Sequence, residues 1–223
     1  ARGQDIVGCP YQAKNSNSSN ANLLLQKLDP ATGDVIWTVY SDKGSLRLNA
    51  SAQPTKDGGV MIVSDVVNLA DRKEKALFRL VGSDGLKAEV EHSPDLRGRT
   101  VTEGVMAKID KDGKVLWARL IATTTHPTPK RFGGYAAFYN SLALDSEDNI
   151  YICGNYLSEM TFTKRNGSVE KHQAKSTKAW DGTSQSWAGD PFIAKFDKDG
   201  YLLQFMTEDE SSILHATFDR MVI

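Results

Sequence analysis

Residues 104–120 read GVMAKIDKDGKVLWARL, and this phrase occurs three times along the chain. It returns as PFIAKFDKDGYLLQ at 191–204 and, with a longer turn, as LQKLDPATGDVIW at 25–37. Each copy is an apolar strand ending in Lys-apolar-Asp, then a turn with Gly, then a second apolar strand. Repetition on this scale predicts a repeated supersecondary unit before any other residue is considered. A repeated unit is mostly scaffold, so the pattern informs about architecture more than about activity.

A second phrase alternates with the first. SLALDSEDNIYICGNY at 141–156 has its counterpart in AQPTKDGGVMIVS at 52–64. Both predict a strand, a short polar turn and another strand. In chain order, one unit is strand A, polar turn, strand B, a long excursion, strand C, Gly turn and strand D. Four antiparallel strands in a meander form the blade of a β-propeller, so we predict an all-β, propeller-like fold.

The two ends of the chain carry one blade between them. Joined end to end, FDRMVI at 218–223 and ARGQDIVGC at 1–9 align without a gap onto 139–153. We therefore predict that the last strand is strand A of the blade whose other strands open the chain, since ring closure removes an unpaired sheet edge. The prediction is one propeller-type domain over 1–223, with blade 1 at 214–223 plus 1–41, blade 2 at 46–121 and blade 3 at 135–208.

About three blade equivalents are fewer than the four to eight of typical propellers. Three arrangements remain open. The chain is part of a larger ring, several copies complete a ring together, or strand pairing between molecules builds a fibre. We favour the first.

Composition is that of a globular β protein, with 40% hydrophobic residues, 25% charged residues and a net charge of −1. A nucleic-acid binder would show a basic face, which this balance does not predict. No apolar run reaches the roughly 18 residues of a membrane span. No signal peptide is visible either. The first residue is Ala1 rather than an initiator Met, which would fit a processed or trimmed start.

The excursions between strands B and C, at 67–103 and 155–190, are the variable segments. Each predicts an extra hairpin, one with a turn at 83–85 and one with Asn-Gly at 166–167. Loops on a rigid scaffold commonly carry binding specificity. The second excursion holds Trp180 and Trp187, which either stack on sugar rings or anchor a protein partner, or else cap their own blade.

The repeated phrases resemble the SBBP family of propeller repeats, through GVMAKIDKDGKVLWARL, PFIAKFDKDGYLLQ and SLALDSEDNIYICGNY. The resemblance implies a secreted or cell-surface scaffold or interaction module and carries no catalytic residues. The chain departs from the pattern in its long excursions, its few blades and Gln204 in place of the third Trp. DPATGDVIW at 29–37 also resembles the tryptophan-docking repeat of quinoprotein dehydrogenases, which implies many copies around a quinone cofactor; only this copy has the Thr-Gly form.

Two Asp-Lys-Asp-Gly turns are the candidate metal sites. Paired carboxylates before a Gly are similar to the start of a calcium loop, but the further oxygen ligands and flanking helices of such a loop are missing. We expect hairpin turns in which Asp binds local backbone amides, with calcium as the alternative. The four carboxylates are those of Asp110, Asp112, Asp197 and Asp199.

Other recurring residues have structural interpretations. Lys27, Lys108 and Lys195 precede the Asp of each copy, and we expect them to face outward or into the channel, paired with a neighbouring carboxylate, rather than to bind ligands. Cys9 and Cys153 occupy equivalent positions in different blades, too far apart for a disulfide, so two buried reduced thiols are expected. Three sequons would accept glycans in a eukaryotic secretory pathway; their acceptors are Asn17, Asn49 and Asn166.

No catalytic residue can be assigned, because the sequence has no His pair at ligand spacing, no Gly-x-Ser-x-Gly elbow and no phosphate-binding Gly-rich loop. We predict a non-enzymatic structural or adhesive module that self-assembles or binds a protein partner. Its expected location is secreted or at the cell surface, with the periplasm as the alternative. The main alternative is a carbohydrate- or protein-binding module that uses the loops 67–103 and 155–190; a propeller-fold enzyme is the second.

Overall fold

The structure is a computed structural model and describes residues 7–8, 23–43, 45–46, 51–67, 76–92, 102–123, 136–137, 142–156, 159–174 and 190–207. These residues form strands and turns and contain no helix, so the predicted all-β fold is confirmed for this part of the chain. Accordingly, none of them forms a helix that could cross a membrane. The strands are β1 (Val7–Gly8), β2 (Leu24–Leu28), β3 (Val35–Lys43), β4 (Ser45–Leu46), β5 (Ser51–Pro54), β6 (Val60–Val67), β7 (Ala76–Val81), β8 (Lys87–His92), β9 (Thr102–Ile109), β10 (Val115–Thr123), β11 (Ala136–Ala137), β12 (Leu142–Leu144), β13 (Ile150–Tyr156), β14 (Glu159–Thr163), β15 (Val169–Gln173), β16 (Asp190–Phe196) and β17 (Leu202–Thr207).

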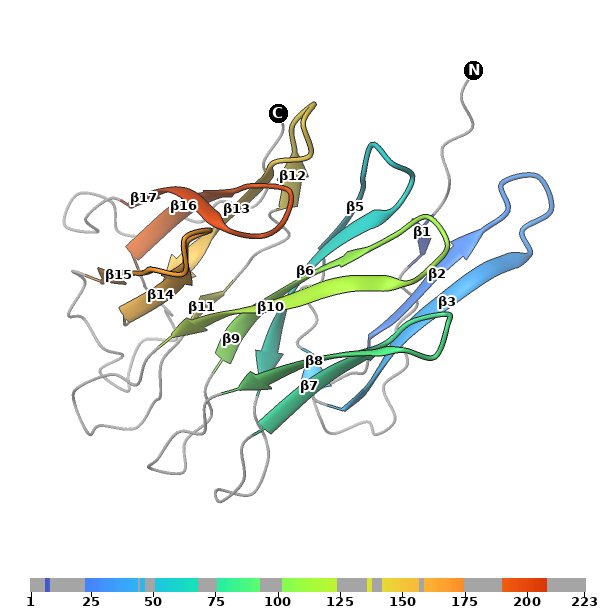
Figure 1. Cartoon of the computed structure of the whole chain (residues 1–223), viewed down its shortest axis with the longest axis horizontal. Helices are drawn as coiled ribbons and strands as arrows, with labels where there is room; N and C mark the ends of the chain where they lie inside the picture. Colours follow the sequence, from blue (N-terminus) through green and yellow to red (C-terminus); the bar gives the residue numbers. More distant parts are fainter. Residues whose placement is uncertain are drawn as a thin grey trace, which may run out of the picture.

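The strands form three antiparallel sheets that lie side by side (Figure 1). The first has the order β1-β2-β3-β7-β8, and the third has the order β11-β13-β16-β17 with β12 also on β13. The second runs β15-β14-β10-β9-β6-β4, with β5 also on β6. The predicted meander is present twice in full, as β5-β6-β9-β10 and β12-β13-β16-β17. We call the units containing β1–β3, β4–β10 and β11–β17 the first, second and third repeat.

The two predicted hairpins are confirmed, but each one extends the sheet of the preceding repeat. The hairpin β7–β8 pairs with β3 through Tyr40↔Val81 and Ser41↔Leu80. The hairpin β14–β15 pairs with β10 through Ala122↔Thr161. Sheet membership therefore departs from the predicted blade ranges, because an open edge of strand D offers unpaired backbone groups that a neighbouring hairpin can satisfy.

The predicted joining of the two chain ends concerns mainly residues outside the described part. β1 pairs with β2 through Val7↔Lys27 and Gly8↔Gln26, where strand B is expected beside strand C. The partner segment 214–223 is not among the described residues. Closure into a ring therefore stays a prediction.

Two hydrophobic cores lie between the three sheets, and the second sheet contributes side chains to both. Along β6, Val60 and Ile62 are buried against the first sheet, while Met61 and Val63 are buried against the third. Successive side chains of a strand point to opposite faces, so a strand buried on both sides has no polar alternation. The run Val-Met-Ile-Val has this property, and it places the second repeat between the other two.

Each repeat has a register shift at the same place in its fourth strand. Pairing passes from Trp37↔Lys27 to Val35↔Leu28, from Trp117↔Lys108 to Val115↔Ile109, and from Gln204↔Lys195 to Leu202↔Phe196. One residue is thus left over in every copy, as in a β-bulge, which re-aims side chains and twists the edge. The extra residues are Ile36, Leu116 and Leu203, 53%, 48% and 54% exposed.

Replacing Phe78 by Ala should destabilise the protein by about 3–5 kcal/mol, the range for emptying a buried aromatic site. Phe78 is fully buried and carries the hairpin β7–β8 into the core between the first two sheets. Leu86→Ala on the same hairpin is the matched control, because Leu86 is 61% exposed. Urea denaturation would measure both changes. Equal effects would show that the hairpin does not dock as described.

Candidate functional site at the junctions between repeats

The tryptophans of the first and second repeats, Trp37 and Trp117, each dock on the Gly turn of the next repeat. The Gly turns are 29–34, 110–114 and 197–201. Trp37 donates its Nε1 hydrogen to the carbonyl of Lys111 at 2.9 Å. A Cβ atom at Gly113 would lie 2.7 Å from Cγ of Trp37, and one at Gly200 would lie 2.8 Å from Cη2 of Trp117. Both glycines also have positive φ, +83° and +80°. Glycine is needed there for its backbone conformation and for the close approach of an indole ring.

The tips of the inserted hairpins hold the same turns from the other side. Ser83 donates from its backbone nitrogen to the carbonyl of Gly113 at 3.0 Å and from its hydroxyl to that of Asp112 at 2.6 Å. In the third repeat, Arg165 binds Asp197 at 3.0 Å and Asp199 at 2.6 Å. Each hairpin therefore reaches back to its own repeat while its strands extend the sheet of the previous one.

The polar turns, 55–59 and 145–149, form a further contact between the second and third repeats. The backbone nitrogen of Lys56 donates to the carboxylate of Asp148 at 3.0 Å, and the ammonium group of Lys56 donates to the carbonyl of Ser146 at 3.4 Å. Asp148 has φ +61° at the position that Gly58 occupies in the other polar turn, with φ +83°. Asp tolerates this left-handed conformation better than most residues do, and here its carboxylate joins two repeats.

Two of the four predicted metal carboxylates, those of Asp110 and Asp197, accept hydrogen bonds from backbone amides. Asp112 pairs instead with Lys111. Oδ1 of Asp110 accepts from the nitrogens of Asp112 and Lys114, both at 2.9 Å. Oδ1 of Asp197 accepts in the same way from Asp199 and Tyr201, both at 3.0 Å. Hydrogen bonding to Arg165 lowers the pKa of Asp199. No cluster of three potential metal ligands occurs within the described ranges, and these contacts support the predicted hairpin-turn role.

Two of the recurring lysines pair with carboxylates of their own polar turns, as predicted. Lys108 is only 8% exposed, and its ammonium group lies 3.1 Å from Asp57. The ammonium group of Lys195 lies 3.6 Å from Asp145 and 4.9 Å from the centre of the Tyr151 ring. These pairs tie strand C to the polar turn within each repeat.

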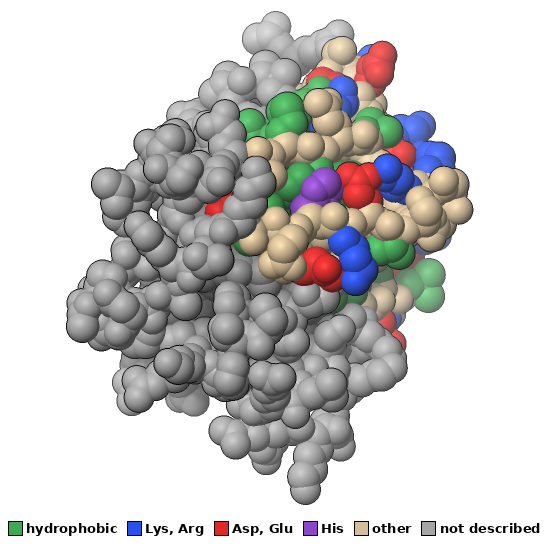
Figure 2. Space-filling view, turned by 90° about the vertical axis from the view of Figure 1, so that its left-hand side faces the viewer, with side chains coloured by type: hydrophobic (Ala, Val, Ile, Leu, Met, Phe, Trp, Pro, Cys, Tyr) green, Lys and Arg blue, Asp and Glu red, His purple; other side chains and the backbone are tan. Residues whose placement is uncertain are grey.

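Charged side chains on the hairpin β14–β15 pair with one another. Lys171 lies 2.8 Å from Glu159, and Glu170 binds both Lys164 and His172. The pKa of Glu170 is lowered, with the hydrogen bond from Lys164 as the main cause. Figure 2 shows both signs of charge next to each other on the described part of this face, so it presents no field of a single sign.

The remaining predicted residues divide between described and undescribed parts of the chain. Cys153 is buried, at 1% exposed. Asn166 is exposed at the tip of β14–β15, where its Oδ1 accepts from the backbone nitrogen of Ser168 at 2.9 Å and from its hydroxyl at 2.7 Å. The others lie outside the described residues; they are Cys9, Asn17, Asn49, Trp180 and Trp187.

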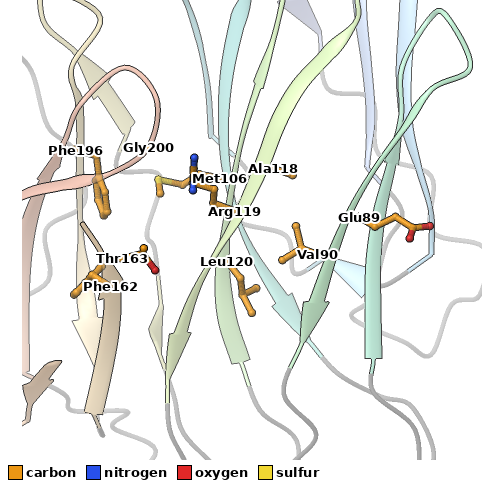
Figure 3. A pocket seen from close by; sticks show the side chains of 10 residues that line it. All are labelled: Glu89, Val90, Met106, Ala118, Arg119, Leu120, Phe162, Thr163, Phe196 and Gly200. Carbon is orange, nitrogen blue, oxygen red and sulfur yellow. The ribbon is translucent and has the colours of Figure 1, made fainter. Parts of the chain in front are cut away.

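A cavity of about 310 Å³ opens where the second and third repeats meet (Figure 3). The sequence analysis did not predict it, because its walls come from strands that are far apart in the chain. The one signal was a departure from the repeat, since Arg119 stands where the first repeat has the buried Val39. Its lining residues are Glu89, Val90, Met106, Ala118, Arg119, Leu120, Phe162, Thr163, Phe196 and Gly200.

Comparison with known proteins gives no match, either to a protein-family model or to a curated protein sequence. The geometry of the junctions and of the cavity is therefore the basis for a functional assignment.

Gly113→Ala should destabilise the protein by about 1–3 kcal/mol more than Gly33→Ala does. Both positions have positive φ, +83° and +78°, so the backbone penalty is shared. Only Gly113 has a tryptophan ring in the way, because nothing lies within 4 Å of a Cβ at Gly33. Denaturant unfolding followed by tryptophan fluorescence would measure the difference. Equal losses would refute the docking contact.

Asp145 should make the protein sensitive to acid. Burial alone would raise the pKa of Asp145, but hydrogen bonds from the side chain and backbone of Asn149, from Glu147 and from Tyr151 lower it to about 2. A carboxylate with a depressed pKa stabilises the folded state above its unfolded pKa of about 3.9 and loses that contribution as the pH falls toward 2. Asp145→Asn should therefore be less stable than the wild type at pH 6.

The difference between Asp145→Asn and the wild type should shrink between about pH 5 and pH 2, as measured by unfolding free energies across this range. Asn149→Ala should reduce the pH dependence as well, because its side-chain amide donates to Asp145 at 2.9 Å. A difference that stays constant with pH would contradict the role of the ionised carboxylate.

Proposed function

We propose that this protein is a non-enzymatic structural or interaction module whose repeats form a rigid scaffold, secreted or at the cell surface. The observation that carries the proposal is the role of the recurring residues in contacts that hold the fold together. Trp37, Gly113 and Asp110 all serve contacts between repeats or within a turn. Residues that repeat with the architecture and are engaged in it favour a scaffold over a catalytic centre.

A propeller-like continuation of the three sheets fits this role. The sheets stack with two separate cores, and the inserted hairpins bridge neighbouring repeats. The resemblance of the repeated phrases to SBBP propeller repeats supports the extracellular location. A scaffold of this kind would act by presenting its edges and loops to other molecules, either further copies of itself or a protein partner.

Binding of carbohydrate or protein through the loops 67–103 and 155–190 is the second candidate. It is favoured by the exposed outer surface of the hairpin β14–β15, where Arg165 and Val169 are 61% and 56% exposed. In this case the hairpins would serve both as edge strands and as the base of a recognition surface.

Analytical ultracentrifugation over a hundredfold range of concentration, together with a glycan array probed with the labelled chain, would test the proposal. Concentration-dependent association or selective glycan binding, without turnover of ester, phosphate, glycoside or peptide substrates, is the expected outcome. Association alone supports self-assembly, and glycan binding supports the loop-based candidate. Catalytic turnover by the purified chain, or a monomer that binds neither itself nor any glycan or protein, would overturn the proposal.

A further inference from the structure

Arg119 is held in an unusual environment at the junction between the second and third repeats. Its Nε hydrogen is donated to the carbonyl of Asp199 at 2.9 Å. Its guanidinium carbon lies 4.0 Å from the centre of the Tyr201 ring and 5.6 Å from that of Trp117. Two aromatic rings and one carbonyl therefore fix the group, which is pre-organised because the guanidinium is planar. The terminal nitrogens have no hydrogen-bond partner among the described residues.

The carboxylates near Arg119 are already neutralised by other arginines. Asp197 and Asp199 bind Arg165, at 3.0 Å and 2.6 Å. Glu89, which also lines the cavity, binds Arg79 at 3.2 Å, and Figure 3 shows its side chain directed away from Arg119. Within the part of the chain that the structure describes, Arg119 forms no ion pair. A half-buried cation without a carboxylate partner favours an anion from outside.

The repeat itself does not require this arginine. The first repeat places the fully buried Val39 at the equivalent position, and the third places Met206 there. Tyr201, which stacks on Arg119, likewise stands where the other repeats have Asp34 and Lys114. Both members of the pair therefore depart from the repeat, and they meet across one junction.

The cavity that Arg119 lines is suited to a small and partly polar molecule. Phe162, Phe196 and Met106 lie behind the lining, but at 3%, 2% and 1% exposed they offer a ligand almost no surface, so most of the accessible lining is polar. Thr163 adds a hydroxyl group to the lining (Figure 3). Its volume of about 310 Å³ lies at the lower end of the range for ligand pockets, roughly 300–1,000 Å³.

We propose that this cavity binds a small organic carboxylate. The two terminal nitrogens of Arg119 donate to the two carboxylate oxygens in the bidentate geometry that guanidinium groups favour. This site is separate from the scaffold role proposed above, and neither proposal depends on the other.

Benzoate and benzamide are the matched probes, because they have nearly the same shape and only benzoate carries a charge. Titrations followed by calorimetry and by NMR should show binding of benzoate at least about tenfold tighter than that of benzamide, the factor expected for one charge-assisted pair. Inorganic phosphate serves as a third probe; competition by phosphate would show that the site reads oxyanions in general. Equal affinity for benzoate and benzamide, or no binding of benzoate, would overturn the proposal.

Arg119→Met tests the residue itself, because methionine occupies the equivalent position 206. It should lose benzoate affinity by about tenfold or more while the thermal midpoint, measured without ligand, shows that the protein still folds. Arg119→Lys should recover only part of the affinity, since an ammonium group lacks the planar fork.

Two further variants separate ligand binding from stability. Lys171→Gln removes a cation that is 59% exposed, pairs with Glu159 and lies outside the cavity lining, and it should leave benzoate affinity unchanged. Thr163→Leu adds bulk to the cavity lining without touching the charge and should weaken benzoate and benzamide alike. Loss of benzoate binding in Lys171→Gln but not in Arg119→Met would overturn the assignment, and so would full binding in a folded Arg119→Met.

Discussion

The contact between a tryptophan of one repeat and a glycine of the next is the constraint on which the stack of sheets depends. It needs an indole ring at the start of the fourth strand and a turn that exposes its backbone. Gly113 meets the second need with φ +83° and no side chain in the path of Trp37. Because the ring also donates to Lys111, its position is fixed by both packing and direction. The apolar faces of neighbouring sheets are thereby brought into register.

The inserted hairpins make the repeats depend on one another. β7–β8 belongs to the second repeat by sequence, to the first sheet by backbone pairing, and to the core between them through Phe78 and Leu80. In the same way, β14–β15 belongs to the third repeat by sequence, to the second sheet by backbone pairing, and to the core between the second and third sheets. In a linear repeat protein, stability is the sum of repeat terms and nearest-neighbour interface terms. Because each inserted hairpin pairs with the sheet of the neighbouring repeat, part of the stabilising free energy lies in the interface terms rather than in the repeat terms. Neighbouring repeats should therefore unfold together.

The sequence predicts what is local and misses what depends on distant pairing. Asn166-Gly167 predicted a hairpin because the turn chemistry lies within two residues, and the alternating phrases predicted the four-strand meander. Neither pattern reveals that β7–β8 would pair with β3, since an open edge accepts any strand of suitable length. The sequence does not predict the extra residue Leu116 either, because a bulge changes the strand register without changing the composition. The cavity at Arg119 is missed for the same reason: five strands build it.

The docking of the repeats has a direction. The tryptophan lies on the fourth strand of one repeat and packs on the Gly turn of the following repeat. A repeat that has this tryptophan can therefore dock a following repeat in this way, and a repeat without it cannot. The third repeat has Gln204 at the donor position, an exposed residue whose amide must stay hydrated or hydrogen-bonded. The first repeat has an acceptor turn whose Gly33 meets nothing within 4 Å among the described atoms. The two outer repeats are therefore chemically distinct surfaces: one retains the glycine that an incoming tryptophan requires, and the other would have to use a different interaction.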